Sequence, residues 1–173
     1  DKRLITLFER SLNAKSENIF YPFGTFTRKE KDLSQFNNVT FAGSLGKLFR
    51  NDIRDFPGRS FLKPESNKVA EIQKILQDFG KDKKIGISWK SQKARYSEDK
   101  TKDLKELKTI FKIPNVKFIN LQYGETHDEL EDFRKKENIE IITINKIDLF
   151  DDFETICALL KNLDLFVTVS NST

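Results

Sequence analysis

Polar side chains that could bind a ligand follow three separate apolar segments of the sequence. They are Ser88, Lys90 and Ser91 around residues 85–89, Gln122 and Tyr123 after residues 116–121, and Ser170, Asn171, Ser172 and Thr173 after residues 165–169. A lysine ammonium can neutralise a phosphate, and the backbone amides that open a helix bind phosphate oxygens with help from the helix dipole. Lys90 and the 170–173 segment are therefore candidate phosphate contacts, with Ser88 and Ser91 as nearby hydrogen-bond donors.

Each candidate also has a purely structural interpretation. The 170–173 segment can cap a helix without any ligand. Lys90 can face solvent, and Tyr123 can cover the edge of the core. For Trp89, packing beneath its loop is favoured over stacking on a ligand.

The remaining reactive side chains carry no clear chemistry. His127 is the one histidine, and we expect it on the surface without a catalytic role. Asp151 and Asp152 precede a predicted helix, whose dipole accounts for them. No spacing typical of metal ligands occurs. Cys157 is expected to be a small core residue.

Regular elements alternate along the second half of the chain. Apolar and β-branched runs predict strands, and 3.6-residue periodicity predicts helices. Strands are expected over residues 85–89, 116–121, 139–144 and 165–169, and helices over 69–79, 104–111, from Thr126, and over 152–162. Thr126 and Glu129 have the spacing of a capping box. This order predicts an α/β, Rossmann-like parallel sheet with helices on both faces, and ligands bind beyond the carboxyl ends of such strands.

The first 60 residues are less regular. We expect a helix over residues 4–12, short strands over 18–23 and 39–42, and a turn-rich hinge over 55–58. The length of 173 residues predicts one domain, or one domain plus a piece of another.

Charge and composition exclude several classes of function. The 31 Lys and Arg nearly balance 27 Asp and Glu along the 173 residues, giving a net charge of +4 without a dense basic arm. This pattern excludes a nucleic-acid partner and suits a small anionic ligand. One cysteine allows no intrachain disulfide, which fits a reducing, cytoplasmic location. We expect no transmembrane helix and find no signal peptide.

Six segments, in order, resemble a known family. They are residues 1–11, residues 43–50 followed by 55–57, residues 61–64, residues 85–91, residues 118–124 and residues 164–173. Together they are similar to the heptosyltransferase-like glycosyltransferase domain that follows tetratricopeptide repeats in many bacterial proteins. That domain is a distant relative of the O-linked N-acetylglucosamine transferases.

The resemblance implies a GT-B fold, with two Rossmann-like domains facing across a cleft. Residues 1–60 would be the tail of the acceptor-side domain and linker, and residues 61–173 the nucleotide-sugar-binding domain without its final helices. The candidate residues named above would hold the donor, with Gln122 and Tyr123 at the base or ribose. Transfer would go to a hydroxyl of a glycan, lipid or protein, with no metal and no cofactor.

The sequence also departs from the family pattern. Heptosyltransferases usually have Asp where Ser170 stands, so heptose is not implied as the donor. The family histidine five positions past Ser170 lies beyond Thr173, and we read the chain as a fragment with no assigned catalytic residue. The alternative is a non-catalytic Rossmann-like domain of a repeat protein that binds a nucleotide or a partner.

Overall fold

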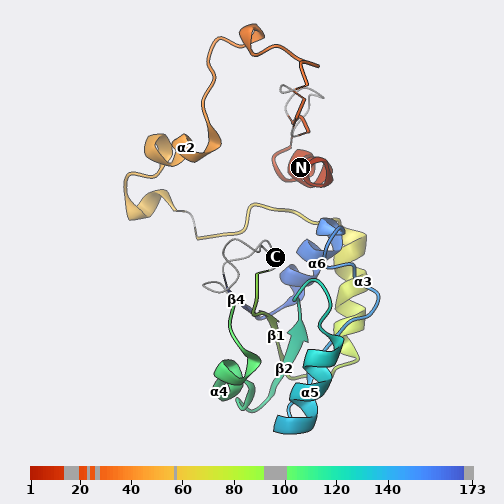
Figure 1. The fold of residues 1–173 in the computed structure, drawn as a ribbon. Coiled ribbons are helices and arrows are strands. Elements are labelled where there is room, and N and C mark those ends of the chain that lie inside the picture. Colours follow the sequence, from red (N-terminus) through yellow and green to blue (C-terminus); the bar gives the residue numbers. More distant parts are fainter. Residues whose placement is uncertain (14–19, 23, 26–27, 57, 92–100, 170–173) are drawn as a thin grey trace. The chain divides into compact units, whose positions relative to one another are not determined.

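The computed structural model describes residues 1–13, 20–22, 24–25, 28–56, 58–91 and 101–169. Ser170, Asn171, Ser172 and Thr173 lie outside the described residues, so their predicted role stays a prediction. The chain divides into two compact units, Asp1–Lys63 and Pro64–Thr173 (Figure 1). Each unit is described by itself.

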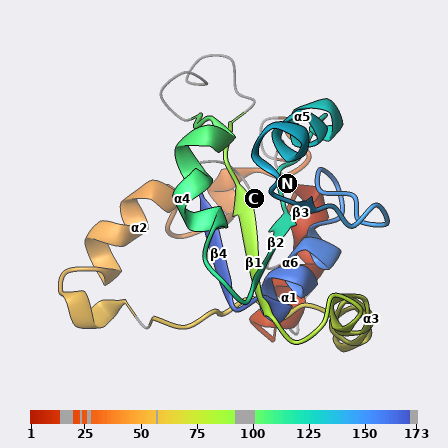
Figure 2. The ribbon, with the colours of Figure 1, turned by 90° about the horizontal axis from the view of Figure 1, so that it is seen from below.

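The second unit is built on a parallel four-stranded sheet. Its strands are β1 (Lys83–Ser88), β2 (Val116–Asn120), β3 (Ile141–Ile142) and β4 (Leu165–Thr168). The spatial order is β3-β2-β1-β4, and every pairing is parallel (Figure 2). The predicted α/β, Rossmann-like fold class is thereby confirmed.

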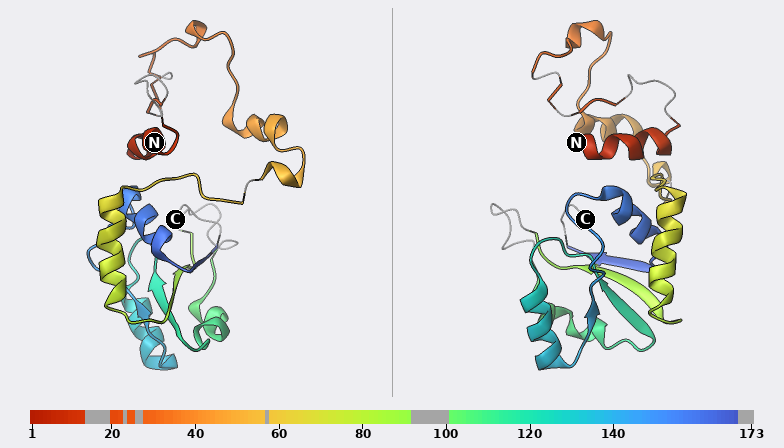
Figure 3. Two further views of the ribbon diagram at one scale, coloured as in Figure 1. Left: turned by 180° about the vertical axis from the view of Figure 1, so that it is seen from behind. Right: turned by 90° about the vertical axis from the view of Figure 1, so that its right-hand side faces the viewer.

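Helices cover both faces of this sheet, which makes three layers (Figure 3, right). On one face lie α3 (Ser66–Gln77) and α6 (Phe153–Asn162), which contribute Ile72, Leu76, Ala158 and Leu159 to one core. On the other lie the short helix η5 (Leu104–Leu107), α4 (Lys108–Phe111) and α5 (His127–Glu137). Their Leu104, Phe111 and Phe133 form a second core with Ile87 and Phe118.

Strand periodicity decides which residue enters which core. Successive side chains of a strand point to opposite faces, so Phe118 and Ile119 of β2 enter different cores. Gly86 of β1 faces the α3/α6 layer. A Cβ atom at Gly86 would lie 2.6 Å from Leu163 Cδ1 and 3.1 Å from Phe166 Cδ2, so only glycine fits without repacking.

Two residues of this unit account for where a helix begins or ends. The Asp152 carboxylate accepts a hydrogen bond from the Thr155 amide at 2.9 Å and so caps α6. Gly80 follows α3 with φ of +81°, a conformation that glycine adopts without strain. Cys157, expected in the core, is half-buried in α6.

The edges of the sheet differ from the prediction. Residues 139–144 and 165–169 were expected to form strands covered on both faces, but β3 has two residues and Leu165 of β4 is 53% exposed. Among the described residues, each of these strands has a single neighbour, β2 for β3 and β1 for β4. Apolar composition therefore predicted the strands correctly but overstated their burial.

The first unit contains short helices. They are η1 (Lys2–Leu4), α1 (Ile5–Ser11), η2 (Leu33–Gln35), α2 (Ala42–Phe49) and η3 (Ile53–Asp55). The helix expected over residues 4–12 is confirmed by α1. The Ser11 hydroxyl accepts from the Lys63 amide at 2.8 Å, and Arg10 Nε donates to the Lys63 carbonyl at 2.8 Å, which ties α1 to the end of the unit.

The strand predicted over residues 39–42 is wrong. Residues 39–41 have no regular structure, and Ala42 begins α2. Leu45, Leu48 and Phe49 have the i, i+3, i+4 spacing of a helix face, which outweighs the helix-weakening Gly43 and Gly46. In the strand expected over 18–23, only residues 20–22 are described, and they are not in a strand.

Candidate functional site

The carboxyl ends of β1 and β4 lie side by side. Ser88 pairs with Thr168 in the register, and the Val169 amide donates to the Ser88 carbonyl at 3.1 Å. From β1, the chain proceeds outward through β2 and β3 and then returns to place β4 on the other side of β1. This is a topological switch point, the position at which open α/β sheets bind ligands.

Gln122 organises the loop that follows β1. Its Oε1 atom accepts three hydrogen bonds, from the Ser88 hydroxyl at 3.1 Å, the Trp89 amide at 3.0 Å and the Lys90 amide at 2.9 Å. Its Nε2 atom donates to the Tyr123 carbonyl at 3.1 Å. Gln122 and Ser88 are each 1% exposed, so the polar groups of both are directed at the protein. We therefore interpret both as residues that shape the loop.

A second buried amide, Asn120, joins the ends of β2 and β3 to the start of α5. Asn120 Oδ1 accepts from the Gln122 amide at 2.8 Å, and Nδ2 donates to the hydroxyls of Thr126 and Thr143, each at 3.2 Å. The sequence reasoning missed this residue. Its signal was an amide side chain directly after the apolar pair Phe118 and Ile119, because a buried polar group needs partners.

Lys90 is held by an acidic residue that the sequence reasoning assigned elsewhere. Glu129 of α5 accepts from the Trp89 indole at 2.9 Å through Oε1 and from the Lys90 ammonium at 2.5 Å through Oε2. The Lys90 ammonium also lies 5.8 Å from the centre of the Trp89 ring. Trp89 is fully buried, which confirms that it packs beneath its loop.

The expected capping box between Thr126 and Glu129 is consequently wrong. Thr126 precedes α5 but its side chain makes no capping hydrogen bond, since its hydroxyl pairs with Asn120. Glu129 reaches the loop after β1 instead of the helix terminus. Hydrogen bonds with residues elsewhere in the sequence, Asn120 for Thr126 and Trp89 for Glu129, therefore replace the local bonds of a capping box.

The remaining candidate ligand-binding residues that the structure describes, Ser91 and Tyr123, are buried. Ser91 is 7% exposed, and Tyr123 is 9% exposed with its ring centre 6.2 Å from that of Phe150. Tyr123 thus covers part of the core, as its structural interpretation proposed. His127 is exposed, as expected.

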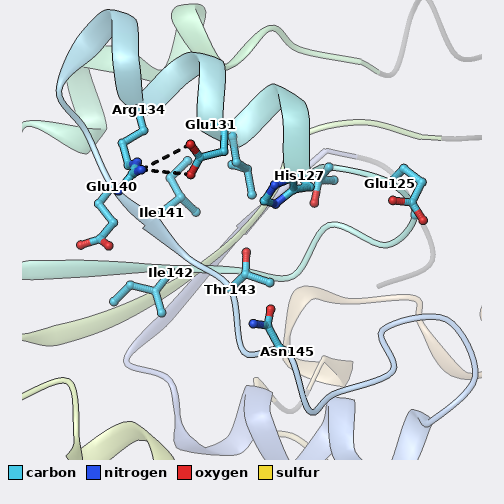
Figure 4. A pocket seen from close by; sticks show the side chains of 12 residues that line it. Glu125, His127, Glu131, Arg134, Glu140, Ile141, Ile142, Thr143 and Asn145 are labelled. Atoms are coloured by element: carbon cyan, nitrogen blue, oxygen red, sulfur yellow. Dashed lines mark hydrogen bonds and ion pairs between the residues drawn. The ribbon is translucent and has the colours of Figure 1, made fainter.

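A polar cavity of about 410 Å³ lies beside the edge of the sheet, between α5 and β3 (Figure 4). His127, Thr143 and Asn145 line it. Glu131 and Arg134 also line it, and they form an ion pair in which Arg134 Nη2 lies 3.2 Å from Glu131 Oε1. Neither Ser88 nor Lys90 is among the residues that line this cavity. Within the described ranges, no cluster of His, Cys, Asp or Glu could hold a metal ion, and no helix is long and apolar enough to cross a membrane.

Comparison with known proteins leaves the family open. The chain is 27% identical to Protein FlbA of Caulobacter vibrioides over 181 aligned positions. The match covers the whole chain and 30% of that protein, so the chain spans less than a third of its relative. No protein-family model matches the sequence, and no solved structure matches it significantly.

Proposed function

We propose that residues 64–173 bind the nucleotide-sugar donor of a metal-independent glycosyltransferase, which transfers the sugar to a hydroxyl of a glycan, lipid or protein. The observation that carries this proposal is the adjacency of the ends of β1 and β4 at the switch point of a parallel sheet. A diphosphate at that position would meet the loop that contains Lys90.

The start of the loop after β1, residues 89–91, is suited to this task because its backbone is preorganised. Gln122 fixes the amides of Trp89 and Lys90 before any ligand arrives, so little conformational entropy is lost on binding. In this proposal Lys90 neutralises phosphate charge, Ser91 lies in the same loop, and Tyr123 borders the base or ribose. Gln122 and Ser88 support the loop, and Ser170, Asn171, Ser172 and Thr173 remain proposed phosphate contacts.

Thermal unfolding of the full chain with nucleoside diphosphates and the matching nucleosides tests the proposal. A ligand at about 100 times its Kd stabilises a native protein by about 2.7 kcal/mol, so a clear rise in Tm is expected with the diphosphates. Nucleosides should give a much smaller rise, because they lack the group that Lys90 neutralises. Equal shifts with both ligand sets, or none with either, would refute the proposal.

The matched variants are Lys90→Gln and Lys81→Gln. Both remove one positive charge from the second unit, but Lys81 is exposed in the turn before β1. Lys90→Gln should abolish most of the diphosphate shift, and Lys81→Gln should leave it unchanged.

The alternative is a non-catalytic domain that binds a nucleotide or a partner. The Lys90–Glu129 ion pair favours the partner-binding form of this alternative, because a lysine already neutralised within the fold needs no anion. Incubation with radiolabelled sugar nucleotides separates the two functions. A diphosphate-dependent Tm shift without any sugar released or transferred would support the non-catalytic domain.

A further inference from the structure

Glu129 holds the Lys90 ammonium on one side of the predicted donor site. Glu129 belongs to α5, which follows β2, and β2 and β4 lie on opposite sides of β1. The ion pair therefore keeps the ammonium on the β2 side of β1, and only 24% of the Lys90 side chain is exposed. An anion above the ends of β1 and β4 would have to draw Lys90 away from α5.

The same carboxylate fixes the neighbouring tryptophan. One oxygen of Glu129 accepts from the buried Trp89 indole and the other from Lys90, so a single side chain holds two successive residues of the loop. Any exchange of partner by Lys90 would change the surroundings of the Trp89 ring, which the ammonium approaches to 5.8 Å.

The exchange is energetically accessible. A partly exposed ion pair contributes little net stability, because water screens it and ordering the side chains costs entropy. A diphosphate carries more negative charge than one carboxylate and offers several acceptor oxygens. It can therefore displace Glu129 from Lys90, while Glu129 keeps its bond to Trp89.

We infer that Glu129 is a positioning residue that competes with the donor diphosphate for the Lys90 ammonium. Without an anion it holds Lys90 against Trp89 and α5. When a diphosphate occupies the ends of β1 and β4, Lys90 moves to it. This inference rests on the proposed function, since it assigns a control element to the same site.

Trp89 provides the measurement, because it is the only tryptophan in the chain. Titration of the full chain with inorganic pyrophosphate, followed by tryptophan fluorescence, should give a saturable change in emission. Glu129→Gln keeps an acceptor for the indole but removes the competing charge, so pyrophosphate should bind about three- to tenfold more tightly. Glu129→Asp keeps the charge on a shorter side chain, and we expect a smaller gain.

Glu131→Gln is the matched control. It removes the same charge from the same helix, but Glu131 pairs with Arg134 and Lys135. Its affinity for pyrophosphate should stay within about twofold of the wild type, because screening weakens more distant charges. In a Lys90→Gln background, the further change Glu129→Gln should leave the affinity for pyrophosphate unchanged, because the ammonium for which Glu129 competes is absent.

The possible failures are distinguishable. If wild type and Glu129→Gln both fail to bind pyrophosphate, the anion site and the competition are overturned together. If pyrophosphate binds but Glu129→Gln leaves the affinity unchanged or weakens it, only the competition is overturned. An equal gain from Glu131→Gln would show a general effect of charge and would also overturn the inference.

Discussion

At the scale of the residue, two buried neutral amides connect the chain segments that follow the ends of β1 and β2. Gln122 and Asn120 are 1% and 4% exposed, and each offers an acceptor and a donor without bringing a charge into the interior. A buried carboxylate would cost far more free energy unless it were paired. An amide is therefore the side-chain type best suited to join several loops at the end of a buried sheet.

Gln122→Ala should destabilise the chain by about 2–4 kcal/mol, because buried donors that lose their acceptor each cost about 1–3 kcal/mol and water can replace part of the loss. The donors concerned are the Ser88 hydroxyl and the amides of Trp89 and Lys90. Urea denaturation followed by Trp89 fluorescence measures the change.

The control for this variant is Gln73→Ala, an identical truncation on the exposed face of α3. It should alter stability by less than about 0.5 kcal/mol, as surface substitutions usually do. Comparable losses from both variants would contradict the role given to Gln122.

At the scale of the element, β1 is the strand around which the second unit is assembled. It pairs with β2 and β4, and the β4 pairing is fixed at both ends. At the start, Asp164 Oδ2 accepts from the Lys84 amide at 2.8 Å, and the Asp164 amide donates to the Lys84 carbonyl at 2.9 Å. At the end, the Val169 amide donates to Ser88. This register is what places the carboxyl ends of β1 and β4 side by side.

The Asp164 carboxylate should make the β1–β4 pairing sensitive to acid. Hydrogen bonds from the Lys83 side chain and the Lys84 amide lower the pKa of Asp164 from its ordinary value of 3.8. A carboxyl whose pKa is lower in the folded state stabilises the fold above its unfolded pKa. That contribution is lost as the pH falls through the depressed folded value.

Asp164→Asn should therefore cost about 0.5–1 kcal/mol at pH 7, a modest loss because water screens this partly exposed pair. The difference from wild type should shrink as the pH falls below about 4. Urea denaturation at pH 7, 5 and 3 measures it, with Asp132→Asn as a control because Asp132 pairs with Lys136 of the same helix. A difference that stays constant down to pH 3 would contradict the assignment.

At the scale of the whole molecule, the two units differ in how they bury apolar surface. Residues 64–173 contain two cores on opposite faces of one sheet. In residues 1–63, large apolar side chains remain in solvent, including Phe41 at 84%, Ile53 at 81% and Phe49 at 62% exposed. Local stability should follow this difference, because segments with few buried contacts open most easily.

Limited proteolysis with trypsin tests this expectation. Cleavage after Arg54 and Arg59, both exposed near the end of the first unit, should precede cleavage after Lys84 by at least about tenfold in rate. Lys84 is 8% exposed, and its ammonium donates to the Gly80 carbonyl at 2.7 Å. Mass spectrometry of timed samples identifies the cuts, and early cleavage after Lys84 would disprove the difference between the units.

The sequence by itself determined the elements of the second unit and their parallel arrangement. Apolar runs and helical periodicity are local signals, and right-handed crossovers then leave few topologies. It also placed Ser88, Lys90, Ser91, Gln122 and Tyr123 at strand ends. In the first unit, with few such signals, a strand was predicted where α2 begins.

Only the tertiary structure decided which side chains meet. Glu129 lies 40 residues from Trp89 in sequence, and its spacing from Thr126 is that of a capping box. No spacing rule could therefore assign Glu129 to the loop after β1. Likewise, β3 and β4 became edge strands through strand order, which composition does not encode. Contacts across the sheet depend on distances in space, and those are fixed only when all the elements pack together.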